Sequence, residues 1–208
     1  MSQKLTIEWL GHASVCIRGD AVVYIDPWNV GRSEPKADVI LITHDHYDHL
    51  SLPDISALRK KDTVVVAEKT GAAKIPAPVR VCAVSERFSL KGIQITGMPA
   101  YNVGKRFHPK QKGYLGFLLR MGGYTFYHTG DSDFIPEMAD VVTDVLFIPC
   151  SGTYVMDADE AIAAIAAISA DIIVPIHYGA IVGEPRDAAR IKEAYGDRVR
   201  LEPSFRLR

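Results

Sequence analysis

The sequence has few of the features that mark specialised protein classes. Its 208 residues include three cysteines, Cys16, Cys82 and Cys150, an odd number spread far apart. That spacing argues against a disulfide framework and favours free thiols in a reducing compartment. No apolar run approaches the roughly 20 residues of a membrane-spanning helix. Glu8 interrupts the apolar segment near the N-terminus, which is not typical of a signal peptide, so we expect a cytoplasmic protein without a membrane anchor.

An excess of charge of one sign is also lacking. The 24 Lys and Arg residues balance 25 Asp and Glu residues, for a formal net charge of −1. This balance argues against a dedicated nucleic-acid binder. The sequence has no linker rich in Pro, Gly or Ser and no repeat of fixed period. Because 48% of the residues are apolar, enough for a sizeable core, we expect residues 1–208 to form a single domain.

The pattern of apolar residues predicts a layered α/β architecture. Strands are expected at 21–26, 38–43, 63–67, 79–84, 92–96, 115–120, 124–127, 145–148 and 172–176, and helices at about 53–60, after 157 and at 185–194. Asp157 and Glu160 have the spacing of a capping box, and Gly122-Gly123 is typical of a hairpin turn. Strands predominate in the first part of the chain, and strand–helix pairs predominate in the last third. This order favours an architecture with β-sheets in the middle and helices on the outer faces.

Three of the seven histidines fall within one six-residue window that directly follows the strand expected to end at Thr43. Side chains two apart on an extended chain point the same way, so His44 and His46 can aim two imidazoles at one point. Asp48 and His49 follow as the chain turns and can aim at a second point nearby. Imidazole and carboxylate together suit Zn²⁺, and also Mn²⁺ or Fe²⁺. The alternative, a polar loop that happens to be rich in His, has little structural use because buried His and Asp need partners.

The pattern His44-x-His46-x-Asp48-His49 resembles the H-x-H-x-D-H signature of the metallo-β-lactamase fold. Further segments resemble the family along almost the whole chain: Leu-Gly-His-Ala at 10–13, Ile-Asp-Pro at 25–27, Tyr-His-Thr-Gly-Asp at 127–131 and Pro-Ile-His-Tyr-Gly at 175–179. The resemblance is greatest to a branch of small hydrolases that includes the ascorbate-6-phosphate lactonases.

This resemblance implies a four-layer αββα sandwich with a two-metal site at its edge. His44 and His46 would hold the first metal; Asp48, His49 and His177 would hold the second; Asp131 would bridge the two. Two features of the sequence agree with the roles that the resemblance implies for Asp131 and His177. Asp131 follows Gly130, where a tight backbone lets a carboxylate enter a site, and His177 ends an apolar strand, where loops carry function.

The function implied is that of a metal-dependent hydrolase with two divalent cations, Zn²⁺ first and Mn²⁺ or Fe²⁺ as alternatives. A metal-bound hydroxide would attack a lactone, another ester, an amide or a phosphoester, and Asp48 would orient it. The alternative function is that of a metal-binding or metal-sensing module that catalyses no reaction.

The sequence departs from the family at the third histidine of the first metal. Asn102 stands where the family has His, and His108 follows six residues later. Either the site is weaker or His108 completes it. A neutral amide oxygen is a weak partner for Zn²⁺, so we favour His108 as a ligand or as a contact to substrate beside the first metal.

Two further histidines have open roles. His12 either donates a hydrogen bond to a metal-bound group or lines the site, or it is a loop histidine with its own partners. His128 lies on the strand that leads to Asp131 and is expected to be a core histidine, or one that hydrogen-bonds a ligand from behind, rather than a ligand itself.

Positive charge gathers at residues 105–112. Such a run is usually a solvated loop face. The functional interpretation is that Lys105, Arg106 and Lys110 attract a small anionic, for example phosphorylated, substrate. There is no extended basic face, so we expect a small-molecule substrate and no nucleic acid; a homo-oligomer is left open.

Overall fold

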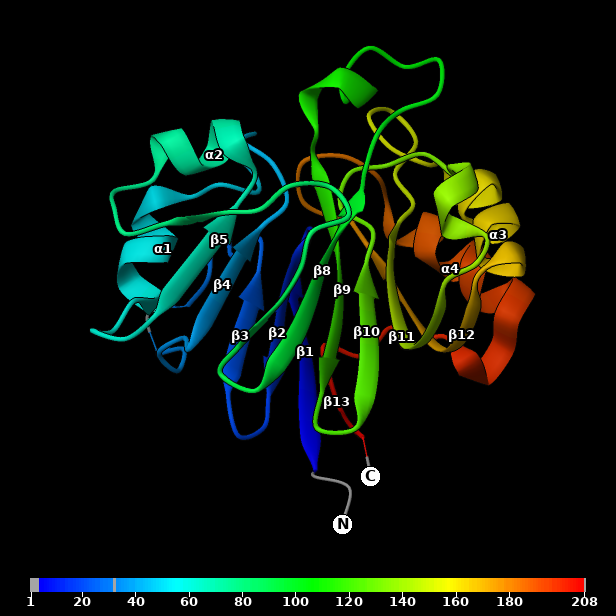
Figure 1. Cartoon of the computed structure of the whole chain (residues 1–208). Coiled ribbons are helices and arrows are strands. Elements are labelled where there is room, and N and C mark those ends of the chain that lie inside the picture. The colour runs from blue at the N-terminus through cyan, green and yellow to red at the C-terminus, as the bar shows by residue number, and fades with distance from the viewer. Residues whose placement is uncertain (1–3, 32, 208) are drawn as a thin grey trace.

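A computed structural model describes residues 4–31 and 33–207, and its strands form two sheets that face each other (Figure 1). The first sheet has seven strands in the order β13-β1-β2-β3-β4-β5-β6. These strands are β1 (Leu5–Gly11), β2 (Ser14–Arg18), β3 (Val22–Ile25), β4 (Val39–Ile42), β5 (Val64–Ala67), β6 (Arg80–Val81) and β13 (Ser204–Leu207). Neighbours from β3 to β6 run parallel, and the other pairs are antiparallel.

The second sheet has six strands in the order β12-β11-β10-β9-β8-β7. These are β7 (Arg87–Leu90), β8 (Ile93–Pro99), β9 (Leu115–Met121), β10 (Tyr124–His128), β11 (Val142–Pro149) and β12 (Ser169–Ile176). Strands β10, β11 and β12 are parallel, so each sheet has a parallel part whose carboxyl ends carry connecting loops.

Helices cover the outer face of each sheet and complete four layers. The elements α1 (Leu52–Leu58) and α2 (Lys69–Lys74) lie on the seven-stranded sheet; α3 (Ala158–Ala167) and α4 (Pro185–Tyr195) lie on the six-stranded sheet. Short 3-10 turns occupy Lys110–Lys112, Pro136–Met138 and Gly196–Arg198. This is the αββα sandwich expected from the sequence. No helix among the described residues is long and apolar enough to cross a membrane.

Strand β4 shows why its sequence is apolar at every position. Val39 and Leu41 pack into the core between the two sheets, whereas Ile40 and Ile42 pack under the helices of the outer layer. A strand buried on both faces has no polar side, so its run of apolar residues ends only where the strand ends. The polar residues that follow β4 therefore stand at the edge of the sandwich.

Most local predictions are confirmed. The turn at Gly122-Gly123 joins β9 and β10 as an antiparallel hairpin, and both hydrogen bonds of the Asp157–Glu160 capping box form at the start of α3. The sequence patterns missed α2 and the strands β1, β2, β7 and β13. Strand β13 comes from the far end of the chain and pairs with β1, a long-range contact that no local pattern encodes.

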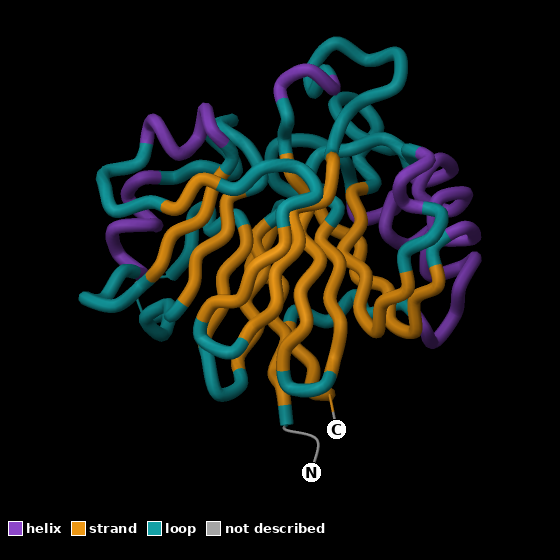
Figure 2. The backbone as a smooth tube through the Cα atoms, in the orientation of Figure 1, coloured by secondary structure: helices purple, strands orange, loops and turns teal. Residues whose placement is uncertain are grey.

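The connecting loops gather at one edge of the sandwich, and the described ends of the chain lie at the opposite edge (Figure 2). Loops that follow β1, β4, β8, β10, β11 and β12 all contribute to this edge. The carboxyl ends of parallel strands are where open α/β sheets usually bind ligands.

Candidate metal centre

The first group of side chains at this edge consists of His44, His46 and His108, and one ring nitrogen of each lies within 4.8 Å of the others. Nδ1 of His46 lies 3.0 Å from Nε2 of His44 and 3.2 Å from Nε2 of His108. Ligand nitrogens of a tetrahedral Zn²⁺ with bonds of 2.0–2.1 Å stand about 3.3 Å apart, so this spacing fits a shared cation. The first two residues follow β4, and the third lies 62 positions beyond His46 in the β8–β9 connection.

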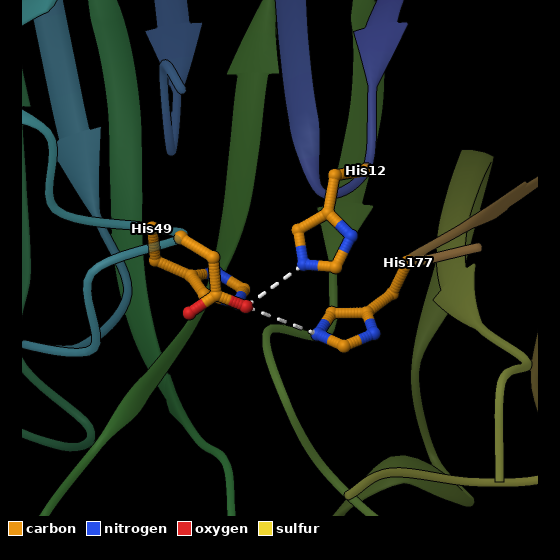
Figure 3. A group of neighbouring side chains, drawn as sticks. His12, His49 and His177 are labelled. Carbon is orange, nitrogen blue, oxygen red and sulfur yellow. Dashed lines mark hydrogen bonds and ion pairs between the residues drawn. The ribbon is translucent and has the colours of Figure 1, made fainter. Parts of the chain in front are cut away.

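The second group consists of His12, Asp48, His49 and His177. Figure 3 shows the rings of His12, His49 and His177 converging from three segments of the chain. Nε2 of His12 lies 2.9 Å from Oδ2 of Asp48, and Nε2 of His177 lies 3.9 Å from the same oxygen. The three histidines are buried, whereas Asp48 keeps 14% of its side chain exposed.

Asp131 lies between the two groups. Its Oδ2 is 3.0 Å from Nε2 of His177, 3.4 Å from Nε2 of His108 and 3.9 Å from Nε2 of His44. Its Oδ1 is 3.3 Å from Nε2 of His49. One carboxylate therefore touches both groups, the geometry that a bridging ligand requires.

Gly130 brings Asp131 into this position. Its φ is +63°, and a Cβ there would stand 2.5 Å from the carbonyl oxygen of Leu115. Only glycine adopts this conformation beside a neighbouring strand without a clash, so the tight turn after β10 depends on it.

Contacts behind the rings orient four of the histidines. In each case Nδ1 meets a protein oxygen: Thr43 Oγ1 for His44 (2.9 Å), Asn102 Oδ1 for His108 (3.1 Å), Asp26 Oδ2 for His49 (2.7 Å) and Ser151 Oγ for His177 (3.0 Å). A partner on one ring nitrogen fixes the ring and leaves the other nitrogen to face the site, as in metal-bound histidines.

The ring nitrogens that face the site indicate whether a cation fits between the two groups. Nε2 of His49 and Nε2 of His177 are buried and have no hydrogen-bond partner among residues 4–31 and 33–207. The nearby oxygens of Asp131 are close enough for ion pairs, but the angles do not make hydrogen bonds. Buried polar nitrogens rarely lack a partner, and a divalent cation between these atoms supplies one.

The electrostatics of the two groups differ. Burial lowers the pKa of His44 well below its ordinary value, and burial likewise lowers the pKa of His108, so both imidazoles stay neutral and able to bind a cation. Burial opposes a proton on His49 as well, but the carboxylates of Asp131 and Asp26 outweigh burial and raise the pKa of His49 well above its ordinary value.

Both carboxylates of the site stay ionised. Burial alone would raise the pKa of Asp48, but the hydrogen bond from His12 and the charge of His49 lower it to about 2. Burial likewise opposes the ionised form of Asp131, and His177 and His49 hold its pKa well below the ordinary range.

Sequence reasoning missed the part played by Asp26. This buried residue has a φ of +47°, and its carboxylate accepts hydrogen bonds from the backbone N–H (2.7 Å) and hydroxyl (2.5 Å) of Thr43 and from His49. It ties the end of β3 to the loop after β4. An aspartate at the end of a buried strand, before a proline, was the available signal.

Asn102 lies behind His108 rather than in the cation group. Its Oδ1 accepts from both the backbone N–H (3.0 Å) and Nδ1 (3.1 Å) of His108, and its Nδ2 donates to Asp133 and to the carbonyl of Tyr154. Its amide oxygen is thus used by the histidine that stands among the ring nitrogens.

The two remaining histidines differ. The ring of His12 hydrogen-bonds Asp48, its Nδ1 is buried without a partner among the described residues, and its φ is +49°. His128 is buried, and its Nε2 meets the carbonyl of Ala13 while its Nδ1 accepts from the backbone N–H of Gly130. His128 is a core histidine, as the sequence suggested.

A pocket of about 420 Å³ opens over both groups. Its lining consists of Asp45, His46, Tyr47, Asp48, Phe107, His108, Asp131, Tyr154, His177 and Ile181. The three basic residues expected to bind substrate are not in that lining. Lys105 pairs with Asp133 and Glu160, Lys110 pairs with Glu137, and Arg106 is exposed.

Comparisons with known proteins agree with this geometry. The sequence pattern of the β-lactamase superfamily domain matches residues 6–177. A UPF0173 metal-dependent hydrolase from Methanoregula boonei is 31% identical over 201 residues, which cover 90% of this chain and 88% of that relative.

Two solved structures extend the likeness. A protein from Parabacteroides distasonis, assigned as a metal-dependent hydrolase, is 31% identical with a TM-score of 0.86 and covers 95% of this chain and 92% of its own. A protein from Thermotoga maritima, assigned as a zinc-dependent hydrolase of the metallo-β-lactamase superfamily, is 20% identical with a TM-score of 0.67 over 98% of this chain and 92% of its own, a likeness of fold alone.

The predicted family, fold and enzyme class are confirmed by these matches, whereas the particular resemblance to ascorbate-6-phosphate lactonases stays a prediction. The clusters of His and Asp able to hold a cation are those of a metal-dependent enzyme. The chain belongs to the metallo-β-lactamase superfamily and is a metal-dependent hydrolase.

Proposed function

We propose that this hydrolase cleaves a small ester, lactone, amide or phosphoester at a centre of two divalent cations. The observation that carries the proposal is the convergence of two His-rich groups on one carboxylate, Asp131, beneath an open pocket. Cations in such a centre lower the pKa of water and polarise the oxygen of the bond to be broken.

The proposed ligands follow the two groups. His44, His46 and His108 would hold the first cation, and Asp48, His49 and His177 would hold the second. Asp131, which lies between the two groups, would serve both. The predominance of imidazole supports Zn²⁺, although Mn²⁺ and Fe²⁺ accept the same donors.

Asp48 orients the attacking water. Its carboxylate lines the pocket, and its partly exposed side chain can accept a hydrogen bond from a water molecule there. A pKa of about 2 keeps it ionised at neutral pH, so it serves as an acceptor that fixes the direction of attack.

We propose that residues 1–208 form one domain that acts in the cytoplasm on a small molecule. Support for a single unit comes from the site itself, since His46 belongs to a loop of the seven-stranded sheet and His108 to a loop of the six-stranded sheet. Neither sheet alone carries a complete first group.

The test combines metal content with turnover. The purified full chain is loaded with Zn²⁺ or Mn²⁺, its metal is counted by elemental analysis, and a panel of lactones, esters, amides and phosphodiesters is assayed. The expected result is about two cations per chain and metal-dependent hydrolysis of one substrate class. Two bound cations with no turnover of any class would favour the non-catalytic, metal-sensing alternative.

A further inference from the structure

Four side chains outside the two cation groups form an apolar rim around the pocket: Tyr47, Phe107, Tyr154 and Ile181. They come from the loops after β4, β8, β11 and β12. Tyr47 is 67% exposed, Phe107 is 45% exposed and Ile181 is 37% exposed. Large apolar side chains gathered at the mouth of a polar site mark a binding surface more often than chance.

Two members of the rim, Phe107 and Tyr154, are connected to the first cation group. The ring of Phe107 packs edge-on against Tyr154, with centroids 4.5 Å apart and planes at 89°. The carbonyl of Tyr154 accepts from Asn102 Nδ2 at 3.0 Å and contacts Nδ1 of His108 at 3.2 Å. A group that rests on these rings is therefore held at a set position beside the candidate centre.

No lysine or arginine is among the residues that line the pocket in the described chain. The carboxylates that line it are those of Asp45, Asp48 and Asp131. The nearby Lys74 forms an ion pair with Asp45, and Lys105 forms ion pairs with Asp133 and Glu160. Beyond the cations themselves, nothing in this lining complements a second negative charge on a substrate.

The volume sets the size of the group that fits. A cavity of about 150 Å³ holds one benzene ring. The pocket, at about 420 Å³, has room for a reacting group at the cations and for a substituent of about ring size beside it.

We propose that the rim selects substrates in which an uncharged aromatic or bulky aliphatic group adjoins the scissile bond, with Phe107 and Ile181 as specificity-determining residues. This inference rests on the proposed function and names its substrate class. It differs from the anionic substrate suggested by the basic segment of the sequence.

The test uses two probes with the same chelating head, acetohydroxamate and benzohydroxamate, and a third, 4-carboxybenzohydroxamate, that adds a negative charge. Binding to the Zn²⁺-loaded full chain is measured by calorimetry, with metal content checked in every sample. The ring is expected to tighten binding about tenfold or more over the methyl group, and the added carboxylate is expected to cancel most of that gain.

Variants locate the effect. Phe107→Ala and Ile181→Ala are expected to weaken benzohydroxamate about fivefold while acetohydroxamate binding and metal content stay within twofold. Phe134→Ala and Leu201→Ala are matched controls, because both residues are 37% exposed and neither lines the pocket. All four side chains are partly exposed, so the variants are expected to fold.

Four outcomes would overturn the inference: equal affinity for the methyl and phenyl probes, tighter binding of the carboxylated probe, an equal loss in the control variants, or no binding of either simple probe. Failure of the proposed function has a separate signature, namely ring-selective binding without hydrolysis of any substrate class.

Discussion

The two cation groups of this site are built differently. His44, His46 and His108 form a group of imidazoles alone, and His46 and His108 line the pocket. The other group adds a carboxylate, Asp48, and two of its members, Asp48 and His177, also line the pocket. Negative charge strengthens the hold on a cation, so we expect the second position to bind its cation more tightly and the first to be the more labile one.

The groups also differ in how they are supported. The charged, buried Asp26 orients His49 in the second group, and the neutral amide of Asn102 orients His108 in the first. Hydrogen bonds to charged groups are stronger than neutral ones, which adds to the expected difference in affinity.

The largest effect is expected from Asp131→Asn, which removes what the two groups share. The variant keeps the size of the side chain but loses the charge that touches both groups. We expect a loss of hydrolysis of about 10³-fold or more and of at least one metal per chain, measured by assay and elemental analysis, because a few kcal/mol of electrostatic stabilisation equal that factor. Retention of two metals and full activity would remove Asp131 from the centre.

The variants His108→Ala and Asn102→Ala distinguish a metal ligand from the residue that orients it. The first variant is expected to lose one metal equivalent and keep the tightly held one. The second is expected to keep both at saturating metal but to bind the labile cation roughly 10–100-fold more weakly, the usual cost of losing a residue behind a ligand. Loss of a metal only in Asn102→Ala would reverse the assignment.

His12→Gln examines the second group. The ring of His12 holds Asp48 through a 2.9 Å contact, so its loss should weaken the tightly bound cation by about tenfold and leave the labile one unchanged. Co²⁺ loading followed by absorption spectroscopy gives a readout independent of turnover. Thr143→Val removes one buried hydrogen bond, to the carbonyl of Val145, outside both groups and serves as the control. An equal change in both variants would mean a general loss of packing.

Chelation should lower the melting temperature. Cations that bind only the folded chain stabilise it by about 2.7 kcal/mol at a hundredfold excess over Kd, which corresponds to roughly 5–10 °C for a chain of this size. His108→Ala isolates the second group, and most of the shift in melting temperature should persist in this variant if the second group binds its cation more tightly. An unchanged melting curve in a sample shown to be metal-free would contradict a buried centre.

The smallest effect is a difference in proton release at pH 7. The pKa of His49 is raised, so this ring carries a proton that a cation must displace, whereas the lowered pKa values of His44 and His108 leave them already neutral. Binding at the second group should release about one proton and binding at the first close to none, with release at the second group fading as pH rises above the pKa of His49. Calorimetry in buffers of different ionisation enthalpy, with His108→Ala to isolate the second group, measures this; equal release at both positions would contradict it.

Many of the secondary-structure elements follow from the sequence alone. Period and turn residues predicted most of the core strands, though not β1 and β2, together with the β9–β10 hairpin and the cap of α3, because these depend on contacts between residues close along the chain. The residues from His44 to His49 also predicted a metal site, because four side chains able to bind a metal have few structural uses directly after a buried strand. The family resemblance supplied the layer order.

The contacts between site residues that lie far apart in the sequence depend on the tertiary fold. The approach of His108 to His46 spans 62 positions, the contact of His12 with Asp48 spans 36, and the hydrogen bond of Asp26 to His49 spans 23. The partners of Lys105 and Lys110 and the apolar rim likewise come from separate loops. Such contacts arise because two sheets packed face to face bring loops distant in sequence to one edge, and no local pattern of residues records which side chains will face each other there.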